Sequence, residues 1–201
     1  MMRSGWNWVV LLVACAAACA LGGCSPEEKL ADRSERLGGL WGVRLSSPAF
    51  ENGDPIPQQY TQYGQNISPP LKWSAGPSGV KEWILIVEDA DKKADKQGRP
   101  ALHWMVYQIP GTVTELAEGA AANGLPYPQG KNYLGQQSYA GPKPPKDSKP
   151  HHYYFQIFAI DTPQKLAPGL DRQQLMKKFK GHVLTTGEMT GVYPEPKEEK
   201  E

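Results

Sequence analysis

The sequence has no cysteine after residue 24. Its three cysteines are Cys15, Cys19 and Cys24, all near the N-terminus. A domain formed by the later residues therefore has neither a disulfide bond nor a thiol nucleophile. The sequence also lacks a Gly-x-Ser-x-Gly motif, which disfavours a serine hydrolase of that type.

The apolar run near the N-terminus is too short to cross a membrane as a helix. Val9–Leu21 spans 13 residues, whereas a membrane-spanning helix needs about 20. Arg3 precedes this run and small residues end it, which is the order of a secretory signal. We therefore expect residues 1–23 to be a signal peptide that is removed from the mature protein.

The end of this segment resembles the lipobox of bacterial lipoproteins. In the sequence LGGC, Cys24 occupies the position that receives a lipid, and cleavage takes place just before it. Acyl chains such as palmitate hold a domain at a bilayer because each buried methylene contributes about 0.8 kcal/mol. The residue that follows Cys24 is Ser25 and not an aspartate, which favours the outer membrane as the location. We expect a cell-envelope lipoprotein that is anchored by Cys24 in the outer membrane and faces the periplasm.

The sequence has no excess of charge of either sign. Removal of residues 1–23 takes Arg3 from the 22 basic residues, which leaves 21 against 21 acidic residues. A nucleic-acid-binding protein needs a basic surface that releases counterions from phosphates. We therefore expect no nucleic-acid partner.

The mature chain has the size of one domain with polar ends. Residues 24–39 contain the lipidated cysteine and a charged segment with few large apolar groups, which we expect to be a flexible tether. Residues 195–201 (EPKEEKE) are expected to be a disordered charged tail. One domain is predicted for residues 40–194.

This domain is rich in residues that interrupt helices. Most of the 21 glycines and 19 prolines lie within it and divide it into short segments. Three segments rich in β-branched and aromatic residues are predicted strands: Glu82–Val87, Trp104–Ile109 and Tyr153–Ile160. They are apolar on both faces, which is typical of strands covered on both sides, as in a sandwich or in a sheet capped by loops and a helix.

One helix is predicted, at Asp171–Lys180. Asp171 can cap its N-terminus, and Gln174 stands at the capping-box position. Three apolar side chains share one of its faces: Leu175, Met176 and Phe179. We expect this face to pack on the sheet. His182–Tyr193 returns to a β-type composition and is predicted to be a last strand.

Polar side chains follow the first predicted strand and precede the second. Asp89 and Asp91 come directly after the first strand, and two-residue alternation places them on one face. His103 opens the second strand. An antiparallel pairing of the two strands would return His103 to the end of the sheet at which Asp89 lies.

A third polar group precedes the next strand. The stiff loop Gly141–Pro145 (GPKPP) leads to a strand at whose start His151 and Tyr153 are two residues apart and point to one side. Imidazole and phenol groups donate hydrogen bonds to the oxygens of an anion, and a carboxylate behind a histidine fixes its tautomer. These residue types therefore suit a pocket for an anion.

Together with Asn66–Trp73 (NISPPLKW), these motifs resemble the phosphatidylethanolamine-binding protein family, in its bacterial Raf kinase inhibitor-like branch. The shared pattern is Asp-x-Asp, His-Trp, Gly-Pro-x-Pro-Pro and His-x-Tyr-x-Phe, in this order, from about Phe50 to Tyr193. The resemblance implies a mostly β fold, an antiparallel β-sandwich with one or two short helices. It also implies a cavity for phosphate, phosphorylated head groups of phospholipids, acetate or similar anions.

The resemblance assigns the ligand site to five residues: Asp89, His103, Gly141, His151 and Tyr153. We expect Asp89 to orient His103, His151 and Tyr153 to donate to the anion, and Gly141 to line the mouth. The predicted function is that of a membrane-anchored binding protein for a small anionic or phosphorylated ligand, with a regulatory or inhibitory role.

Two other functions stay open. The Asp/His pair suits an acid–base hydrolase of a phosphoester-type substrate, although we favour binding without catalysis and assign no catalytic residue. Members of the phosphatidylethanolamine-binding protein family are associated with protease and kinase inhibition. The second alternative is therefore an inhibitor of a periplasmic protease. A homodimer and a protein target of inhibition stay open as partners. The spacing of histidines and acids fits neither a zinc nor a calcium site, so we predict no metal and no cofactor.

Other conspicuous side chains have simpler explanations. His152 points away from His151 by strand alternation, and His182 follows the predicted helix, so both are expected to be structural or solvated. Aromatic residues at strand spacing pack in cores more often than they bind ligands. We therefore assign Trp104, Tyr107 and Phe155 to the core.

Overall fold

The computed structural model describes residues 42–93, 98–145 and 149–193. The predicted signal peptide, the predicted lipidation site Cys24, the predicted tether and the predicted charged tail lie outside the described residues. Within the described part of the chain, no helix is both long enough and apolar enough to span a membrane.

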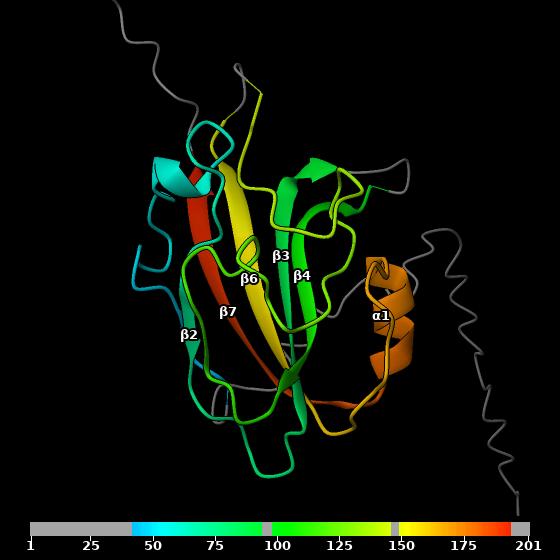
Figure 1. Cartoon of the computed structure of the whole chain (residues 1–201). Coiled ribbons are helices and arrows are strands. Elements are labelled where there is room, and N and C mark those ends of the chain that lie inside the picture. Colours follow the sequence, from blue (N-terminus) through cyan, green and yellow to red (C-terminus); the bar gives the residue numbers. More distant parts are fainter. Residues whose placement is uncertain (1–41, 94–97, 146–148, 194–201) are drawn as a thin grey trace, which may run out of the picture.

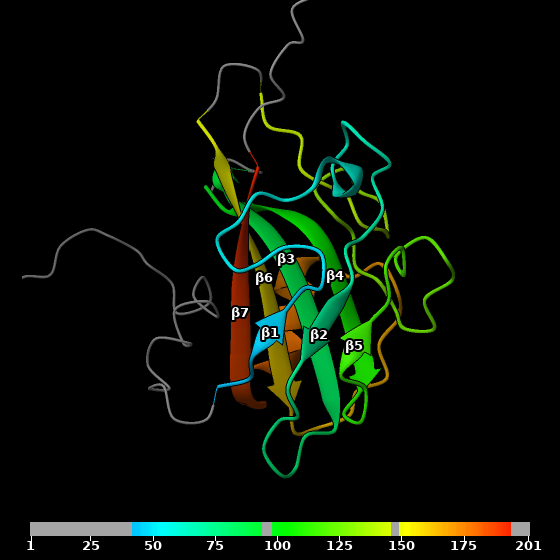
Figure 2. The same ribbon diagram turned by 90° about the vertical axis from the view of Figure 1, so that its left-hand side faces the viewer.

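Two antiparallel sheets stack face to face (Figure 2). The smaller sheet has the order β1-β2-β5, formed by Leu45–Ser46, Leu71–Trp73 and Glu115–Leu116. The larger sheet has the order β4-β3-β6-β7, in which β3 is Glu82–Lys93, β4 is Pro100–Pro110, β6 is His151–Ile160 and β7 is Val183–Tyr193. The expected mostly β, antiparallel sandwich is confirmed.

Strand β3 lies in the middle of the fold because both of its faces are apolar. Trp83, Leu85 and Val87 are buried between the two sheets, whereas Ile84 and Ile86 are buried on the opposite face. The helix α1 (Arg172–Phe179) covers that opposite face, as Figures 1 and 2 show together. The predicted two-sided burial of the central strands is therefore correct, and the larger sheet has one core on each side.

Helix α1 begins with the predicted capping box. The side chain of Asp171 accepts the backbone N–H of Gln174 at 2.8 Å, and the side chain of Gln174 accepts the backbone N–H of Asp171 at 3.0 Å. Leu175 and Phe179 are buried against the sheet. A single turn of 3₁₀ helix, η2 (Gln58–Tyr60), is the second short helix of the described residues.

The N-terminus of α1 is also tied to β3 by charge. The guanidinium Nε of Arg172 lies 2.6 Å from Oε1 of Glu88. Both side chains are largely buried, with exposed fractions of 14% and 5%. Burial raises the pKa of Glu88, and the neighbouring guanidinium opposes this effect. The ion pair fixes the helix next to the residue that precedes Asp89.

Loops cover both outer edges of the larger sheet. Backbone groups of residues 128–140 hydrogen-bond along β4, and those of residues 53–56 hydrogen-bond along β7. The backbone N–H of Val43 pairs with the carbonyl of Thr186 further along β7. The edges that are most prone to recruit a foreign strand are therefore occupied by the chain itself.

Candidate functional site

A β-bulge in β4 determines where His103 lies. Val87 of β3 pairs with Trp104, and the next β3 residue, Glu88, pairs with Leu102, so His103 is an extra residue without a partner on β3. Trp104 belongs to the core between the sheets, whereas Leu102 belongs to the core under the helix. Regular alternation would put both on one face. The bulge therefore changes the direction of the strand's side chains at His103.

The bulge brings His103 next to Asp89, as the antiparallel pairing predicted. Oδ2 of Asp89 lies 4.0 Å from Nε2 of His103 and accepts a hydrogen bond of 2.7 Å from Nδ1 of His151. Oδ1 of Asp89 accepts the backbone N–H groups of Asp91 and Lys92, each at 2.9 Å. Only 1% of Asp89 is exposed, and these three hydrogen bonds replace the water that its carboxylate has lost.

Asp91 does not share a face with Asp89, and this expectation was wrong. The turn closed by Oδ1 of Asp89 interrupts the alternation of β3, whose pairing with β4 is irregular after Asp89. Oδ2 of Asp91 instead accepts from the backbone N–H of His152 at 2.8 Å and from its Nδ1 at 3.0 Å. Because about half of each of these side chains is exposed, this second Asp–His pair lies at the surface, as expected for His152.

The side chain of His103 is oriented by a backbone carbonyl rather than by Asp89. Its Nδ1 lies 2.5 Å from the carbonyl oxygen of Ala140. Because a carbonyl oxygen only accepts, Nδ1 carries the proton. Burial lowers the pKa of His103 from 6.5 to about 4, although the Ala140 carbonyl and Asp89 act in the opposite direction. The imidazole is therefore neutral at pH 7, and its buried Nε2 has no hydrogen-bond partner among the described residues.

Tyr153 supplies a second buried polar atom without a partner. Its hydroxyl makes no hydrogen bond of acceptable geometry within the described part of the chain. Burial raises the pKa of Tyr153, and the nearby carboxylate of Asp89 raises it further, so the phenol keeps its proton. Its ring meets His103 edge to face at 5.2 Å and stacks on His151 at 6.4 Å. The structure therefore brings the four predicted side chains together.

The backbone of Gly141 lies close enough to His103 to raise the pKa of that residue. Its backbone N–H donates to Oδ1 of Asn66 at 2.8 Å, and its carbonyl accepts from Nε2 of Gln62 at 2.7 Å. A Cβ atom at this position would collide with the carbonyl oxygen of Tyr60 and lie 2.8 Å from Cα of Thr61. Both backbone polar groups are therefore used within the protein, and Gly141 permits a close approach of two loops.

Two further side chains belong to the site and were missed by sequence reasoning. The ring of Tyr133 lies 4.9 Å from the ring of His103, and the ammonium of Lys92 lies 3.9 Å from the centre of the Tyr133 ring. Tyr133 lies in a loop without a recognisable pattern. Lys92 could have been identified from the sequence, because it stands only three residues after Asp89. Its charge contributes to the low pKa of His103 and favours an anion.

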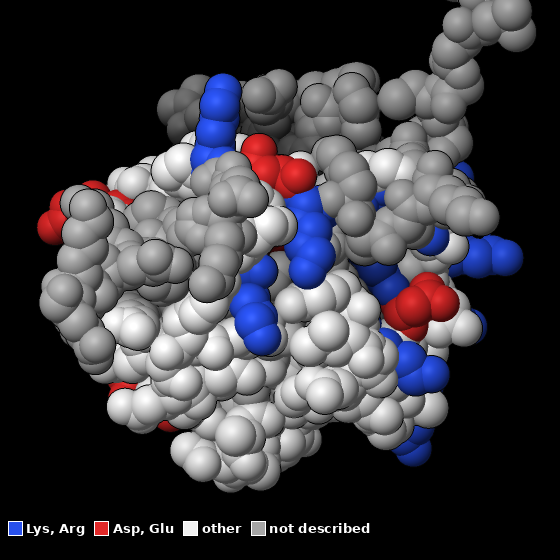
Figure 3. Space-filling model, turned by 90° about the horizontal axis from the view of Figure 1, so that it is seen from above, with Lys and Arg blue, Asp and Glu red and all other residues white. Residues whose placement is uncertain are grey.

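The end of the molecule that carries the site is partly basic. Seen from above in Figure 3, Lys and Arg side chains lie across the middle of this end and along one side, with fewer acidic groups between them. Such a surface attracts small anions before they bind.

The remaining candidates lie elsewhere. His182 contacts Oδ1 of Asp161 at 2.9 Å near the surface, away from the predicted site. Trp104, Tyr107 and Phe155 are fully buried core residues, as expected. Among the described residues, no group of three or more His, Cys, Asp or Glu side chains is arranged to hold a metal ion.

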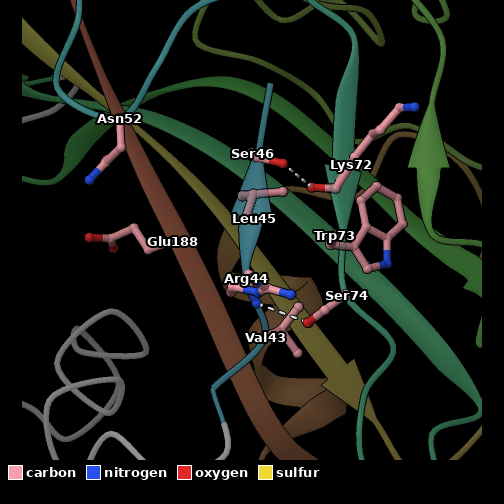
Figure 4. A pocket seen from close by; sticks show the side chains of 9 residues that line it. All are labelled: Val43, Arg44, Leu45, Ser46, Asn52, Lys72, Trp73, Ser74 and Glu188. Carbon is pink, nitrogen blue, oxygen red and sulfur yellow. Dashed lines mark hydrogen bonds between the residues drawn. The ribbon is translucent and has the colours of Figure 1, made fainter. Parts of the chain in front are cut away.

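A groove of about 560 Å³ lies on another face, between β1 and β7 (Figure 4). Its polar lining includes the exposed Arg44, Asn52 and Lys72. Within it, the backbone N–H of Arg44 donates to the hydroxyl of Ser74 at 3.0 Å. Exposed side chains of this kind are hydrated and lose water when they bind a ligand. The buried cluster around Asp89 is therefore the stronger candidate site.

Two stacked antiparallel sheets, with buried imidazole, phenol and carboxylate groups at one end of the larger sheet, define a β-sandwich protein with a small polar site. The sequence profile described as phosphatidylethanolamine-binding protein matches residues 46–194. The chain belongs to the phosphatidylethanolamine-binding protein family, whose fold is that of a binding protein.

Relatives from bacteria support this assignment. A UPF0098 protein of Chlamydia muridarum is 41% identical over 152 residues, which cover 75% of this chain and 98% of that protein. The crystal structure of a putative phosphatidylethanolamine-binding protein homolog from Chlamydia trachomatis is 37% identical, with a TM-score of 0.70, and the match covers 78% of this chain and 100% of that chain. YbcL of E. coli is 30% identical, with a TM-score of 0.69 and coverages of 77% and 99%.

Proposed function

We propose that the protein binds a small anionic ligand, such as a phosphorylated head group, among Asp89, His103, His151 and Tyr153. One observation carries this proposal: Nε2 of His103 and the hydroxyl of Tyr153 are buried, have no hydrogen-bond partner among the described residues, and belong to rings 5.2 Å apart. A buried polar atom without a partner costs about 1–3 kcal/mol. A ligand that satisfies both atoms removes this cost and so binds with a favourable free energy.

Three groups around these atoms suit an anion, although the carboxylate of Asp89 is also near. The Tyr153 hydroxyl keeps its proton and can donate it, and the ammonium of Lys92 is close enough to act on His103. His151 keeps its Nδ1–H on Asp89, so a proton on its other nitrogen would be directed to a ligand. The family to which the chain belongs is named for binding a phosphate-containing molecule, which agrees with an anionic ligand.

Titration of the purified protein with inorganic phosphate tests this proposal. We expect the imidazole resonances of His103 and His151 to shift at millimolar phosphate, while those of the distant His182 stay in place as an internal control. Replacement Tyr153→Phe should weaken binding about fivefold or more, since it removes one buried hydrogen bond. Unchanged His103 and His151 resonances would rule out the site. Release of phosphate from a phosphoester, abolished by His103→Ala, would instead support the hydrolytic alternative.

We also propose that lipid on Cys24 anchors the protein at the periplasmic face of the outer membrane. The LGGC sequence at residues 21–24 supports this proposal. Labelling of cells with radioactive palmitate should mark the protein, and Cys24→Ser should abolish the label, whereas Cys19→Ser should not. Label that persists in Cys24→Ser would contradict the anchor.

A further inference from the structure

The unpartnered nitrogen of His103 is an acceptor, not a donor. The short contact to the Ala140 carbonyl uses the proton on Nδ1, so Nε2 of the neutral ring presents a lone pair. The ring cannot reverse these roles without placing two acceptors, Nδ1 and the carbonyl oxygen, in contact. The geometry of the loop therefore fixes the tautomer.

A second acceptor faces this lone pair. Oδ2 of Asp89 lies 4.0 Å from Nε2 of His103, and no hydrogen bond joins the two atoms. The polar groups that surround His103 come from three elements. Asp89 and Lys92 belong to β3, and His151 and Tyr153 belong to β6. Tyr133 and the backbone groups of Ala140 and Gly141 belong to the adjoining loop.

None of these neighbours gives a proton to Nε2. His151 donates to Asp89, and the ammonium of Lys92 lies against the ring of Tyr133. Among the described residues, Nε2 therefore remains an acceptor that only a ligand or water can satisfy.

We infer that the site selects acid groups that still carry a proton, and that it binds phosphomonoesters in preference to phosphodiesters. This inference rests on the proposed function, because it concerns the same site. The P–OH group of a singly ionised monoester donates to Nε2 of His103, while another of its oxygens accepts from the Tyr153 hydroxyl.

A phosphodiester lacks the required donor. Both of its free oxygens are acceptors, so one of them would face the lone pair of His103. The protein avoids this only by protonating His103, and burial holds the pKa of that residue at about 4. A monoester brings its own proton, since its second pKa is about 6.

Isothermal titration calorimetry at pH 5.5 with methyl phosphate and dimethyl phosphate tests the inference. At this pH both ligands carry mainly one negative charge, so they differ chiefly in the P–OH group. We expect methyl phosphate to bind roughly tenfold or more tightly, because the diester leaves one buried acceptor unpaired. In buffers of different ionisation enthalpy, binding of methyl phosphate should take up only about a quarter of a proton, the share needed to convert the dianion present at this pH. Equal dissociation constants for the two ligands would overturn the inference.

The variant His103→Gln examines the cause of the preference. A glutamine amide offers either a donor or an acceptor, so the two ligands should then differ by no more than about threefold. Tyr153→Phe should weaken both ligands alike, because it removes a donor that both use. If neither ligand binds the unaltered protein, the proposed function fails. If both bind it equally, binding stands and only the selection for a proton fails, whether or not His103→Gln folds.

Discussion

Asp89 and His151 are joined by a hydrogen bond of 2.7 Å, although 62 residues separate them in the chain. The bond links the end of β3 to the start of β6. It is a buried polar contact, because 1% of the Asp89 side chain and 10% of the His151 side chain are exposed. This pair therefore contributes to stability as well as to the proposed binding.

Replacement of Asp89 by alanine should be far more destabilising than replacement of Asp91. Asp89→Ala removes the acceptor of three hydrogen bonds in a buried place, and we expect a loss of about 2–4 kcal/mol in the free energy of unfolding. Asp91→Ala is the matched control, because its pair with His152 is half exposed and should cost less than about 1 kcal/mol. Urea denaturation measures both values. Similar losses for the two variants would contradict the assigned burial.

The low pKa of His103 predicts a loss of stability in acid. Its pKa is about 4 in the folded protein, against an ordinary value of 6.5. Between these values the unfolded chain binds more protons than the folded one, so stability falls as the pH decreases from 6.5 to 4 and this contribution levels off below. The loss should reach about 3 kcal/mol.

Urea titrations at pH 7 and pH 4.5, in buffers without phosphate, measure this effect. The variant His103→Gln has no group that titrates at this position, so its stability should change less over the same interval. An identical pH dependence in the two proteins would show that His103 is not the group responsible.

Gly141→Ala should destabilise the loop that orients His103. The added methyl group would meet the backbone of Tyr60 and Thr61, and backbone moves less easily than a side chain. We expect a loss of about 2 kcal/mol or more and weaker binding of inorganic phosphate. Gly42→Ala is the control, since the nearest atom to its Cβ, the carbonyl oxygen of Thr186, lies at an ordinary 3.7 Å. A stable Gly141→Ala protein would show that the loops are not closely packed.

The ion pair between Glu88 and Arg172 should be costly to break from one side only. Glu88→Leu or Arg172→Leu leaves one buried charge without its partner, which costs about 3 kcal/mol. The double variant should recover most of this loss, because apolar side chains pack in the same space. A double-mutant cycle on urea-denaturation free energies measures the coupling. Additive losses would mean that the two charges are independent.

Much of the larger sheet was predictable because its pattern is local. Short stretches of consecutive residues contain the whole pattern of the strands at Glu82–Val87 and Tyr153–Ile160, and of the capping box of the helix. The predicted first strand stopped at Val87 because its apolar pattern ends there, yet β3 continues to Lys93. The small sheet was not predicted, since β1 and β5 have two residues each, too few to show a period.

The grouping of Asp89, His103, His151 and Tyr153 was predictable from the sequence, but their hydrogen bonds were not. Antiparallel pairing was enough to bring His103 towards Asp89. The hydrogen bond of His103, however, depends on the β-bulge and on the backbone carbonyl of Ala140. Because every residue has the same backbone carbonyl, the sequence does not indicate which one His103 contacts. Lys92 and Tyr133 join the site through a turn and a loop, whose course no periodic pattern records.

The covered edges of the larger sheet limit how two copies of this protein can associate. Residues 128–140 occupy the hydrogen-bonding groups along β4, and residues 53–56 occupy those of β7 near its end. A neighbouring molecule therefore cannot prolong the sheet there by adding a strand of its own. Two copies that meet at these edges should therefore be held by contacts between side chains and not by backbone pairing of strands.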